Sequence, residues 1–168
     1  MNALRSERGT TLIETMVAAA ILLVVLSGLL SMAGLATNYT ENHGHLEART
    51  AEYAQDKMEQ LMALAFTDSV SDTAHEITET SGGTGLALGG SADPSAPADG
   101  YVDWLSDKGQ MLGGGTTAPS DWFYERVWEV TSASATIKQI EVTSTVRSSV
   151  GNALKAKSTV VALKASQF

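Results

Sequence analysis

The sequence contains no cysteine and only three prolines in 168 residues. The absence of cysteine excludes disulfide bonds, zinc–thiolate sites and thiol catalysis. Positive charge is also scarce, since 11 Lys and Arg residues face 19 Asp and Glu residues and leave a net charge of −8. The basic residues are scattered along the chain, whereas binding to nucleic-acid phosphates needs them clustered. We therefore expect no nucleic-acid partner.

One long stretch of the chain lacks charge altogether. Residues 16–36 are 21 residues without a charged side chain, which is enough for a helix to cross the roughly 30 Å hydrocarbon core of a bilayer. The residues before this run are polar and carry Arg5 and Arg8 against one acid, Glu7. Positive charge ahead of an apolar run holds that end in the cytoplasm. The pattern predicts a single-pass inner-membrane protein whose remaining chain lies outside the cytoplasm.

The helix is expected to continue beyond the membrane. From residue 46 to residue 65, apolar positions recur every three or four residues, and charged residues such as Lys57 lie between them. This spacing predicts an amphipathic helix. No proline interrupts residues 10–66, so we expect one nearly continuous helix of about 55 residues, roughly 80 Å long. We divide it into a transmembrane half, 10–37, and an extracytoplasmic amphipathic half, 38–66.

The composition changes sharply after Phe66. Residues 67–100 are dominated by Ser, Thr, Gly, Asp and Ala and carry two of the three prolines, which predicts a long loop. A short segment at 101–105 follows, and the run Gly113-Gly114-Gly115 then predicts a turn. Residues 67–168 are expected to form one loop-rich β-sheet domain.

Three β-strands are expected near the end of the chain, because their residues alternate in polarity or are β-branched. The expected strands span residues 122–131, 137–146 and 157–163, with a turn at 149–152 before the last. Tyr124 and Trp128 share one side of the first strand, where we expect them to pack against the amphipathic helix. The predicted fold class is α+β, with a long N-terminal α-helix packed on a small antiparallel β-sheet.

The residues at the head of the apolar run form a motif, Arg8-Gly9-Thr10-Thr11-Leu12-Ile13-Glu14. It resembles the class III signal of type IV prepilins, in which a short basic leader and a glycine precede an apolar helix that holds one glutamate. The resemblance implies that residues 1–9, with Arg5 and Arg8 as their charge, are a leader peptide. A prepilin peptidase would cleave between Gly9 and Thr10 and methylate the new terminus. The family usually has an apolar residue where this chain has Thr10, which bears on the extent of methylation rather than on cleavage.

Glu14 is the unusual residue of this helix. An acid in a spanning segment costs about 2.5–3.5 kcal/mol, whereas the Val, Ile and Leu side chains of the apolar run contribute roughly −3 to −6 kcal/mol together. The helix therefore inserts despite the acid. Cleavage after Gly9 creates a positive amine at Thr10, four residues from Glu14. In the resembled family such an amine pairs with the glutamate of a neighbouring subunit and sets the register of assembly, so Glu14 is a predicted assembly residue.

Later segments resemble the PilV-like minor pilins. The resemblance lies in the post-membrane helix at 51–61 and in a strand pair that contains Tyr124, Arg126 and Trp128. It implies a pilin-like fold and a minor pilin, a structural subunit of type IV pilus assembly or priming that is not an enzyme and needs no cofactor. The implied partners are other major and minor pilins, the prepilin peptidase, the inner-membrane assembly platform and membrane lipid. The implied location is the inner membrane and then the cell-surface pilus.

Several alternatives remain open from the sequence. A minor pseudopilin of a type II secretion system shares the leader and the architecture, and a membrane-anchored extracytoplasmic binding module would instead keep Met1. An ordinary anchor with an incidental acid and a conventional secretory signal are further possibilities. We expect no metal site, because His43 and His45 have no third ligand nearby. The remaining candidates, Asp99, Asp103 and Asp107, lack the spacing of a calcium loop.

Overall fold

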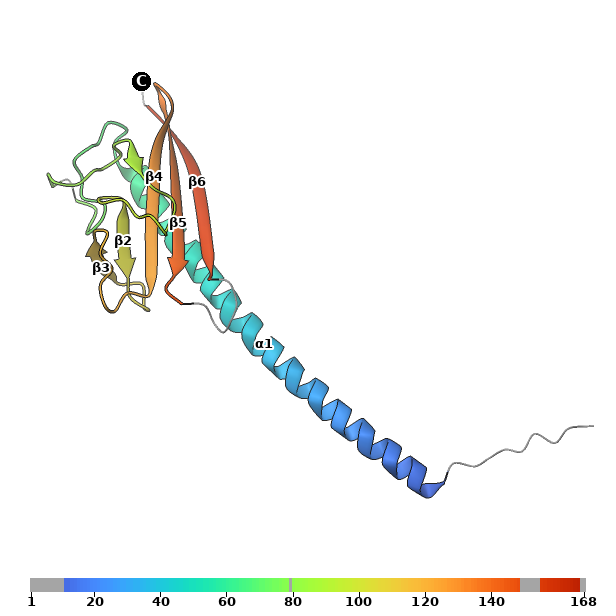
Figure 1. Ribbon diagram of the computed structural model, residues 1–168. Helices are drawn as coiled ribbons and strands as arrows, with labels where there is room; N and C mark the ends of the chain where they lie inside the picture. Colours follow the sequence, from blue (N-terminus) through green and yellow to red (C-terminus); the bar gives the residue numbers. More distant parts are fainter. Residues whose placement is uncertain (1–10, 79, 149–154, 167–168) are drawn as a thin grey trace, which may run out of the picture. The chain divides into compact units, whose positions relative to one another are not determined.

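The computed structural model describes residues 11–78, 80–148 and 155–166. The chain divides into two units, Met1–Glu41 and Asn42–Phe168. The elements are α1 (Leu12–Ala63), β1 (Gly89–Gly90), β2 (Val102–Leu105), β3 (Met111–Gly114), β4 (Tyr124–Ser134), β5 (Ile137–Val146) and β6 (Lys157–Ala165), as labelled in Figure 1. The predicted fold class, α+β with a long N-terminal helix and an antiparallel sheet, is confirmed. The expected turn at 149–152 lies outside the described residues.

α1 is a continuous helix of 52 residues and fills most of the range 10–66 that the sequence predicts to be helical. It ends at Ala63, three residues earlier than expected. At this end the ammonium group of Lys164, from β6, donates a hydrogen bond to the Met62 carbonyl at 2.5 Å. The last turn of a helix leaves carbonyls without intrahelical donors. A lysine from the sheet satisfies one of them, which fixes the helix end against β6.

The sheet has the strand order β3-β2-β4-β5-β6, and β1 pairs with β4 beside β2. Every pairing is antiparallel. β4 and β5 form the longest pairing, from Tyr124 opposite Val146 to Ser134 opposite Ile137. β3 and β6 therefore occupy the two ends of the sheet (Figure 1).

The expectation of a turn at residues 113–115 is wrong for its first two glycines, which belong to β3. A side chain at Gly114 would meet the Ala74 side chain at 2.5 Å and the Val102 carbonyl oxygen at 3.0 Å. Glycine in a strand often marks a place where another part of the chain passes closely. Here the loop that contains Ala74 passes close to β3. Glycine, which suggested a turn, is needed at Gly114 because a side chain would not fit there.

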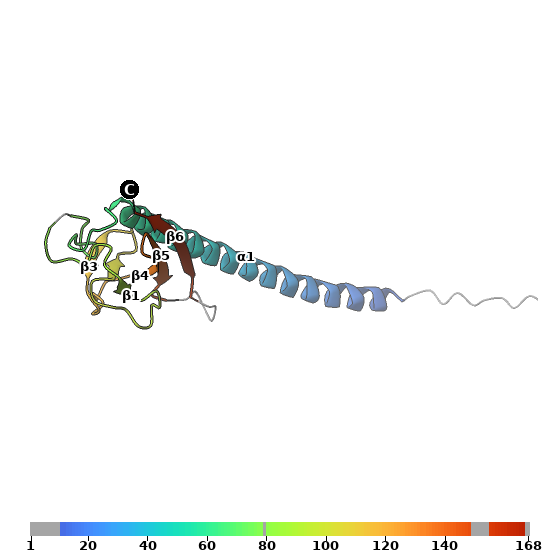
Figure 2. The same ribbon diagram turned by 90° about the horizontal axis from the view of Figure 1, so that it is seen from above.

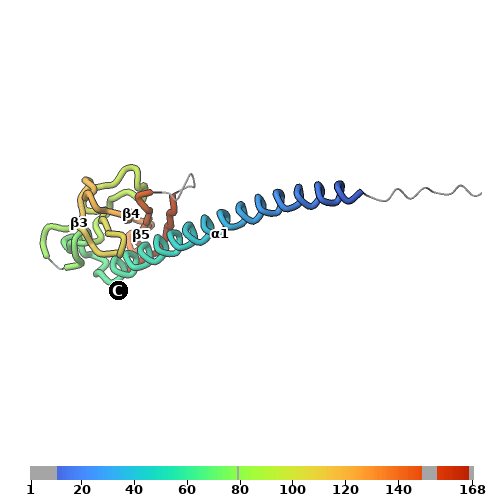
Figure 3. The backbone as a smooth tube through the Cα atoms, turned by 90° about the horizontal axis from the view of Figure 1, so that it is seen from below, coloured from blue at the N-terminus to red at the C-terminus, as the bar shows by residue number. Residues whose placement is uncertain are grey.

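The C-terminal half of α1 packs on one face of the sheet, as seen from above in Figure 2 and from below in Figure 3. The core between them joins Ala54, Met58 and Leu61 of the helix to side chains of the two central strands, namely Trp128, Val130, Ile140 and Val142. The rings of Tyr53 and Tyr124 meet edge to face with 4.8 Å between their centroids. The predicted packing of Tyr124 and Trp128 against the amphipathic helix is confirmed.

A second, smaller core covers the opposite face of the sheet. Successive residues of a strand point to opposite faces, so Val127 points away from the helix that Trp128 contacts. Val127 is buried with Val102 and Trp104, and Trp122 is packed against this cluster. The sheet is thus covered on both faces, which explains why β4 alternates in sequence and is buried almost throughout its first half.

Candidate functional site

Most of the predicted site residues lie at the extreme N-terminus. Arg5, Arg8, Gly9 and Thr10 fall outside the described residues, whereas Glu14 is described and lies exposed in the first turn of α1. The structure thus places Glu14 at the head of the helix, within five residues of the predicted cleavage point.

Thr11 starts the helix and contacts Glu14 directly. The backbone N–H of Glu14 donates to the Thr11 carbonyl at 3.0 Å and lies 3.4 Å from the Thr11 hydroxyl oxygen. Thr-x-x-Glu at a helix start is the capping-box sequence, and an acid in the first turn also interacts favourably with the helix dipole. Glu14 therefore has a role in its own helix that the sequence analysis missed, although the spacing of Thr11 and Glu14 was the signal for it.

The helix beyond Glu14 exposes apolar side chains on all sides. The large hydrophobic residues from Leu12 to Leu35 are 45–80% exposed. The hydroxyls of Ser27 and Ser31 donate back to the carbonyls of Val24 and Ser27 at 2.8 and 2.9 Å, so the helix satisfies its own polar groups there. Among the described residues, one helix is long and apolar enough to cross a membrane. This surface is consistent with a single-pass membrane anchor, because lipid or other helices must cover it.

A buried cluster of four charges joins the helix to the sheet in the second unit. Lys57 Nζ lies 2.6 Å from Asp103 Oδ2 and also donates to the Thr73 carbonyl. Arg126 donates two hydrogen bonds to the same carboxylate, from Nε at 2.7 Å and from Nη2 at 2.9 Å. Its Nη1 donates a third, to the Asp56 carboxylate at 2.9 Å. We call Asp56, Lys57, Asp103 and Arg126 the charge clamp. It connects α1 to β2 and β4.

The electrostatics of the charge clamp follow from its burial. Lys57 and Asp103 are fully buried and Arg126 is nearly so, whereas Asp56 is half exposed. Burial lowers the pKa of Lys57, and the Asp103 carboxylate opposes this shift. Burial also disfavours the charged guanidinium of Arg126, but the two acids outweigh that cost and raise its pKa. Two cations thus face two anions, an arrangement that holds elements together.

The placement of Lys57 corrects the sequence analysis, which put it on the solvent side of the amphipathic helix. The buried stripe of α1 contains Thr50, Ala54, Lys57, Met58 and Leu61. Lys57 follows Ala54 by three residues, which is the spacing of a shared helix face. The Lys57 side chain can be buried because its ammonium group forms an ion pair with Asp103 and lies 4.1 Å from the centroid of the Trp128 ring.

The acids considered for calcium or catalysis do not converge. Both carboxylate oxygens of Asp103 are occupied by Lys57 and Arg126, whereas Asp107 is exposed. Within the part of the chain that the structure describes, no group of three or more His, Asp or Glu side chains could hold a metal ion. The carboxylate of Asp103 thus lies within the charge clamp, in contact with Lys57 and Arg126.

Another buried acid, Glu125, lies on the face of β4 that points away from α1. It is 5% exposed. Burial raises its pKa from the ordinary 4.5 to about 7, while Lys155 acts in the opposite direction and Asp93 adds to the rise. Between about pH 4.5 and 7 the folded state therefore holds a proton that the unfolded state has released. The unfolding free energy should fall as pH rises through this window and stay low above it.

Glu125→Gln is expected to remove this pH dependence. At pH 8 the variant should be more stable than the wild type by about 1–3 kcal/mol, because the neutral amide avoids the cost of a buried carboxylate. At pH 4 the two proteins should be nearly equal. Thermal unfolding followed by circular dichroism from pH 4 to pH 8 measures both. Glu129→Gln, at a partly exposed acid on the same face of β4, is the control and should keep the fall in stability between about pH 4.5 and 7 that Glu125 causes.

Comparison with known proteins identifies the N-terminal motif. The chain matches the family model of the prokaryotic N-terminal methylation motif over residues 4–30. No curated protein and no solved structure matches the chain. The matched segment includes Gly9, Thr10 and Glu14 and the first part of the exposed apolar helix. Together with the helix-on-sheet fold, this match supports a type IV pilin-like protein, a class of membrane-anchored proteins that includes both pilins and pseudopilins.

Proposed function

We propose that this chain is a minor pilin, a structural subunit that takes part in the assembly or priming of a type IV pilus. The observation that carries the proposal is the methylation motif at the head of α1. The part of this helix from Leu12 to Leu35 exposes apolar side chains all round. Such a helix is stable in lipid, and it is equally stable when neighbouring helices replace the lipid. The chain could therefore be stored in the inner membrane and later packed into a fibre.

The proposed sequence of events begins with cleavage. The prepilin peptidase cuts between Gly9 and Thr10 and methylates Thr10, with Arg5 and Arg8 holding the leader in the cytoplasm. The new amine then pairs with the Glu14 carboxylate of a neighbouring subunit as the helix leaves the bilayer. An unpaired charge is costly in apolar surroundings, so this pairing selects the correct axial register.

The second unit supports a structural role. The charge clamp and the apolar core fix the sheet to the C-terminal half of α1, so force on the helix is passed to a domain that is packed on it. The resemblance of residues 51–61 and of the strand pair around Trp128 to PilV-like proteins favours a minor pilin. A pseudopilin of a type II secretion system remains the alternative, because the motif is common to both.

Mass spectrometry of N-terminal peptides tests the proposal. Peptides are compared between sheared surface fibres and inner membranes, with Gly9→Val as the control that should block cleavage. We expect a peptide that begins at Thr10 in the fibre fraction. The same peptide confined to membranes would point to a pseudopilin, and a chain that starts at Met1 in every fraction would overturn the pilin-like role.

A further inference from the structure

The last strand of the sheet has an open edge. β6 pairs with β5 from Lys157 to Ala165, and within the described residues no other strand pairs with it. The strand contains no proline and its pairing shows no bulge. Proteins commonly protect an edge strand with proline, a bulge or charged side chains such as lysine, because an open edge pairs readily with other chains. β6 has a lysine near each end, Lys157 and Lys164, but no such protection over the six residues between them.

The direction of the backbone groups of β6 follows from two hydrogen bonds at its ends. Val146 donates to the carbonyl of Ala156 at 3.2 Å, and Ser166 donates to the carbonyl of Thr136 at 2.8 Å. In an antiparallel pair, hydrogen-bonded residues alternate with residues whose N–H and C=O point outward. The even-numbered residues of β6 therefore bond to β5. The odd-numbered residues, Thr159, Val161 and Leu163 among them, direct their backbone groups to the open edge.

The same odd-numbered residues carry the exposed apolar side chains. Lys164 contacts the Met62 carbonyl and Ser158 lies 2.9 Å from the Thr50 hydroxyl, so the even-numbered side chains face α1. Val161 and Leu163 point to the other face and are 54% and 62% exposed. Each therefore offers both backbone bonding groups and an uncovered apolar side chain to a chain lying alongside.

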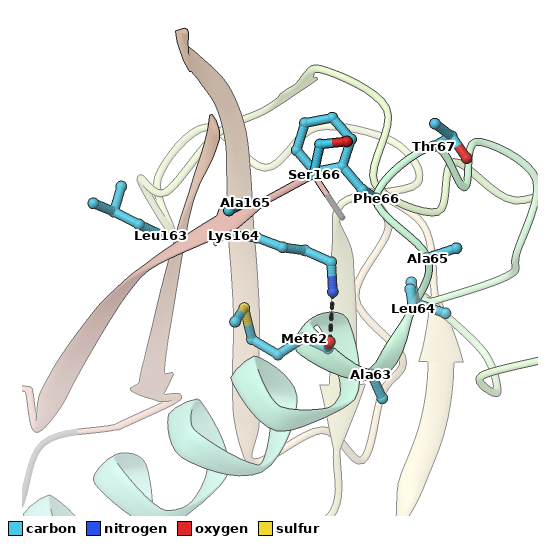
Figure 4. A pocket seen from close by; sticks show the side chains of 10 residues that line it. All are labelled: Met62, Ala63, Leu64, Ala65, Phe66, Thr67, Leu163, Lys164, Ala165 and Ser166. Carbon is cyan, nitrogen blue, oxygen red and sulfur yellow. Dashed lines mark hydrogen bonds between the residues drawn. The ribbon is translucent and has the colours of Figure 1, made fainter. Parts of the chain in front are cut away.

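A pocket of about 770 Å³ lies beside the C-terminal end of β6 (Figure 4). Its walls are residues 62–67 at the end of α1 and residues 163–166 of the β6 segment. Figure 4 shows Lys164 reaching across it to Met62, while Leu163 points away from the helix. The pocket thus lies between the end of α1 and the C-terminal part of β6, on the side of the strand that faces the helix.

We propose that the open edge of β6 binds an extended segment of another polypeptide by strand addition, with apolar residues along Val161 and Leu163 and acidic residues near Lys157. Residues 155–166 contain no acid, although the whole chain has a net charge of −8. Of the three lysines in this segment, Lys164 faces α1 and Lys155 acts on Glu125, whereas the exposed Lys157 lies at the start of the open edge. A second copy of β6 would bring further lysines to this edge and no acid. The partner is therefore a different, acidic segment, and this binding surface does not depend on the pilus role.

Amide hydrogen exchange on the full chain in detergent micelles tests the proposal residue by residue. The probe is a capped peptide, Thr-Val-Thr-Val-Thr-Glu-Glu, added to about 1 mM. Without the probe, the amides of Thr159, Val161 and Leu163 should exchange fast, because only the even-numbered amides bond to β5. With the probe, those three should slow by at least about tenfold, while the even-numbered amides stay unchanged.

Two control peptides and two variants sharpen the test. The probe with alternate N-methyl groups, and a probe with Lys in place of Glu, should both give no more than weak protection. Val161→Pro removes an outward N–H that β5 does not use, so it should keep the fold and lose binding. Lys157→Glu keeps every backbone N–H and should weaken binding at least fivefold, a drop of about 1 kcal/mol.

Three outcomes would overturn the proposal. The first is no slowing of the three odd-numbered amides at the full probe concentration. The second is equal protection by the N-methylated peptide, which would show that backbone bonds are not involved. The third is protection that appears without any peptide and grows with protein concentration, which would make the partner a second copy of this chain.

Discussion

Glu14→Ala is expected to leave cleavage after Gly9 intact and to reduce incorporation of the subunit into fibres by at least about tenfold. Loss of one partner of a desolvated ion pair typically costs about 3–5 kcal/mol, and each 1.4 kcal/mol corresponds to about a factor of ten. The loss arises because the amine at Thr10 would then enter the fibre without its carboxylate. The measurement is the ratio of processed subunit in sheared fibres to processed subunit in membranes.

The contact between Thr11 and Glu14 makes a sharper pair of variants available. Glu14→Gln removes the charge, yet glutamine also serves at this position of a capping box, so the helix start should be preserved. Thr11→Ala removes the capping hydroxyl at a cost of about 1 kcal/mol and keeps the charge. If charge pairing drives assembly, Glu14→Gln fails and Thr11→Ala assembles. The reverse result would show that Glu14 acts by starting the helix.

The elements that the sequence predicted well are those with a local signal. The apolar run and the spacing of residues 46–65 need no knowledge of the rest of the chain, and α1 covers nearly all of the expected helix. The strands β4 and β5 alternate in polarity and β6 is rich in β-branched residues, and each lies within a few residues of its expected range. Glycine-rich β1 and β3 carry no such pattern, because they become strands only by pairing with β4 and β2.

The candidate site residues also fall into two groups, those with a local sequence signal and those that only the fold brings together. The methylation motif is a local pattern of residue types, so residues such as Glu14 could be predicted from the sequence alone, and the match over residues 4–30 has the same origin. The charge clamp joins residues that are far apart in the sequence. Lys57 and Asp103 are 46 positions apart, and Asp103 and Arg126 are 23 positions apart. Only the register of β2 against β4, with Asp103 opposite Arg126, brings these charges together beneath the helix. No spacing along the chain reports that pairing.

The charge clamp predicts a large and asymmetric response to substitution. Asp103→Ala should lower the unfolding free energy by about 3–5 kcal/mol, which for a chain of this size lowers the melting temperature by roughly 10 °C. The reason is that Lys57 and Arg126 would both remain buried, with only the half-exposed Asp56 as counter-charge. Thermal unfolding at pH 7 measures the effect. Asp107→Ala, at an exposed acid two residues beyond β2, should change stability by less than about 0.5 kcal/mol.

Lys57→Met is the variant that separates a stabilising ion pair from a tolerated one. It leaves the two hydrogen bonds between Arg126 and Asp103 in place and adds an apolar side chain to the buried stripe beside Met58, next to the Trp128 ring. Removing one partner of a buried ion pair is costly when the other charge is left without a counter-charge, but here Asp103 keeps the guanidinium of Arg126. We therefore expect a cost below about 1 kcal/mol, far less than for Asp103→Ala. A cost as large as that of Asp103→Ala would show that the Lys57 ammonium itself holds α1 to the sheet, through Asp103 and the Thr73 carbonyl together.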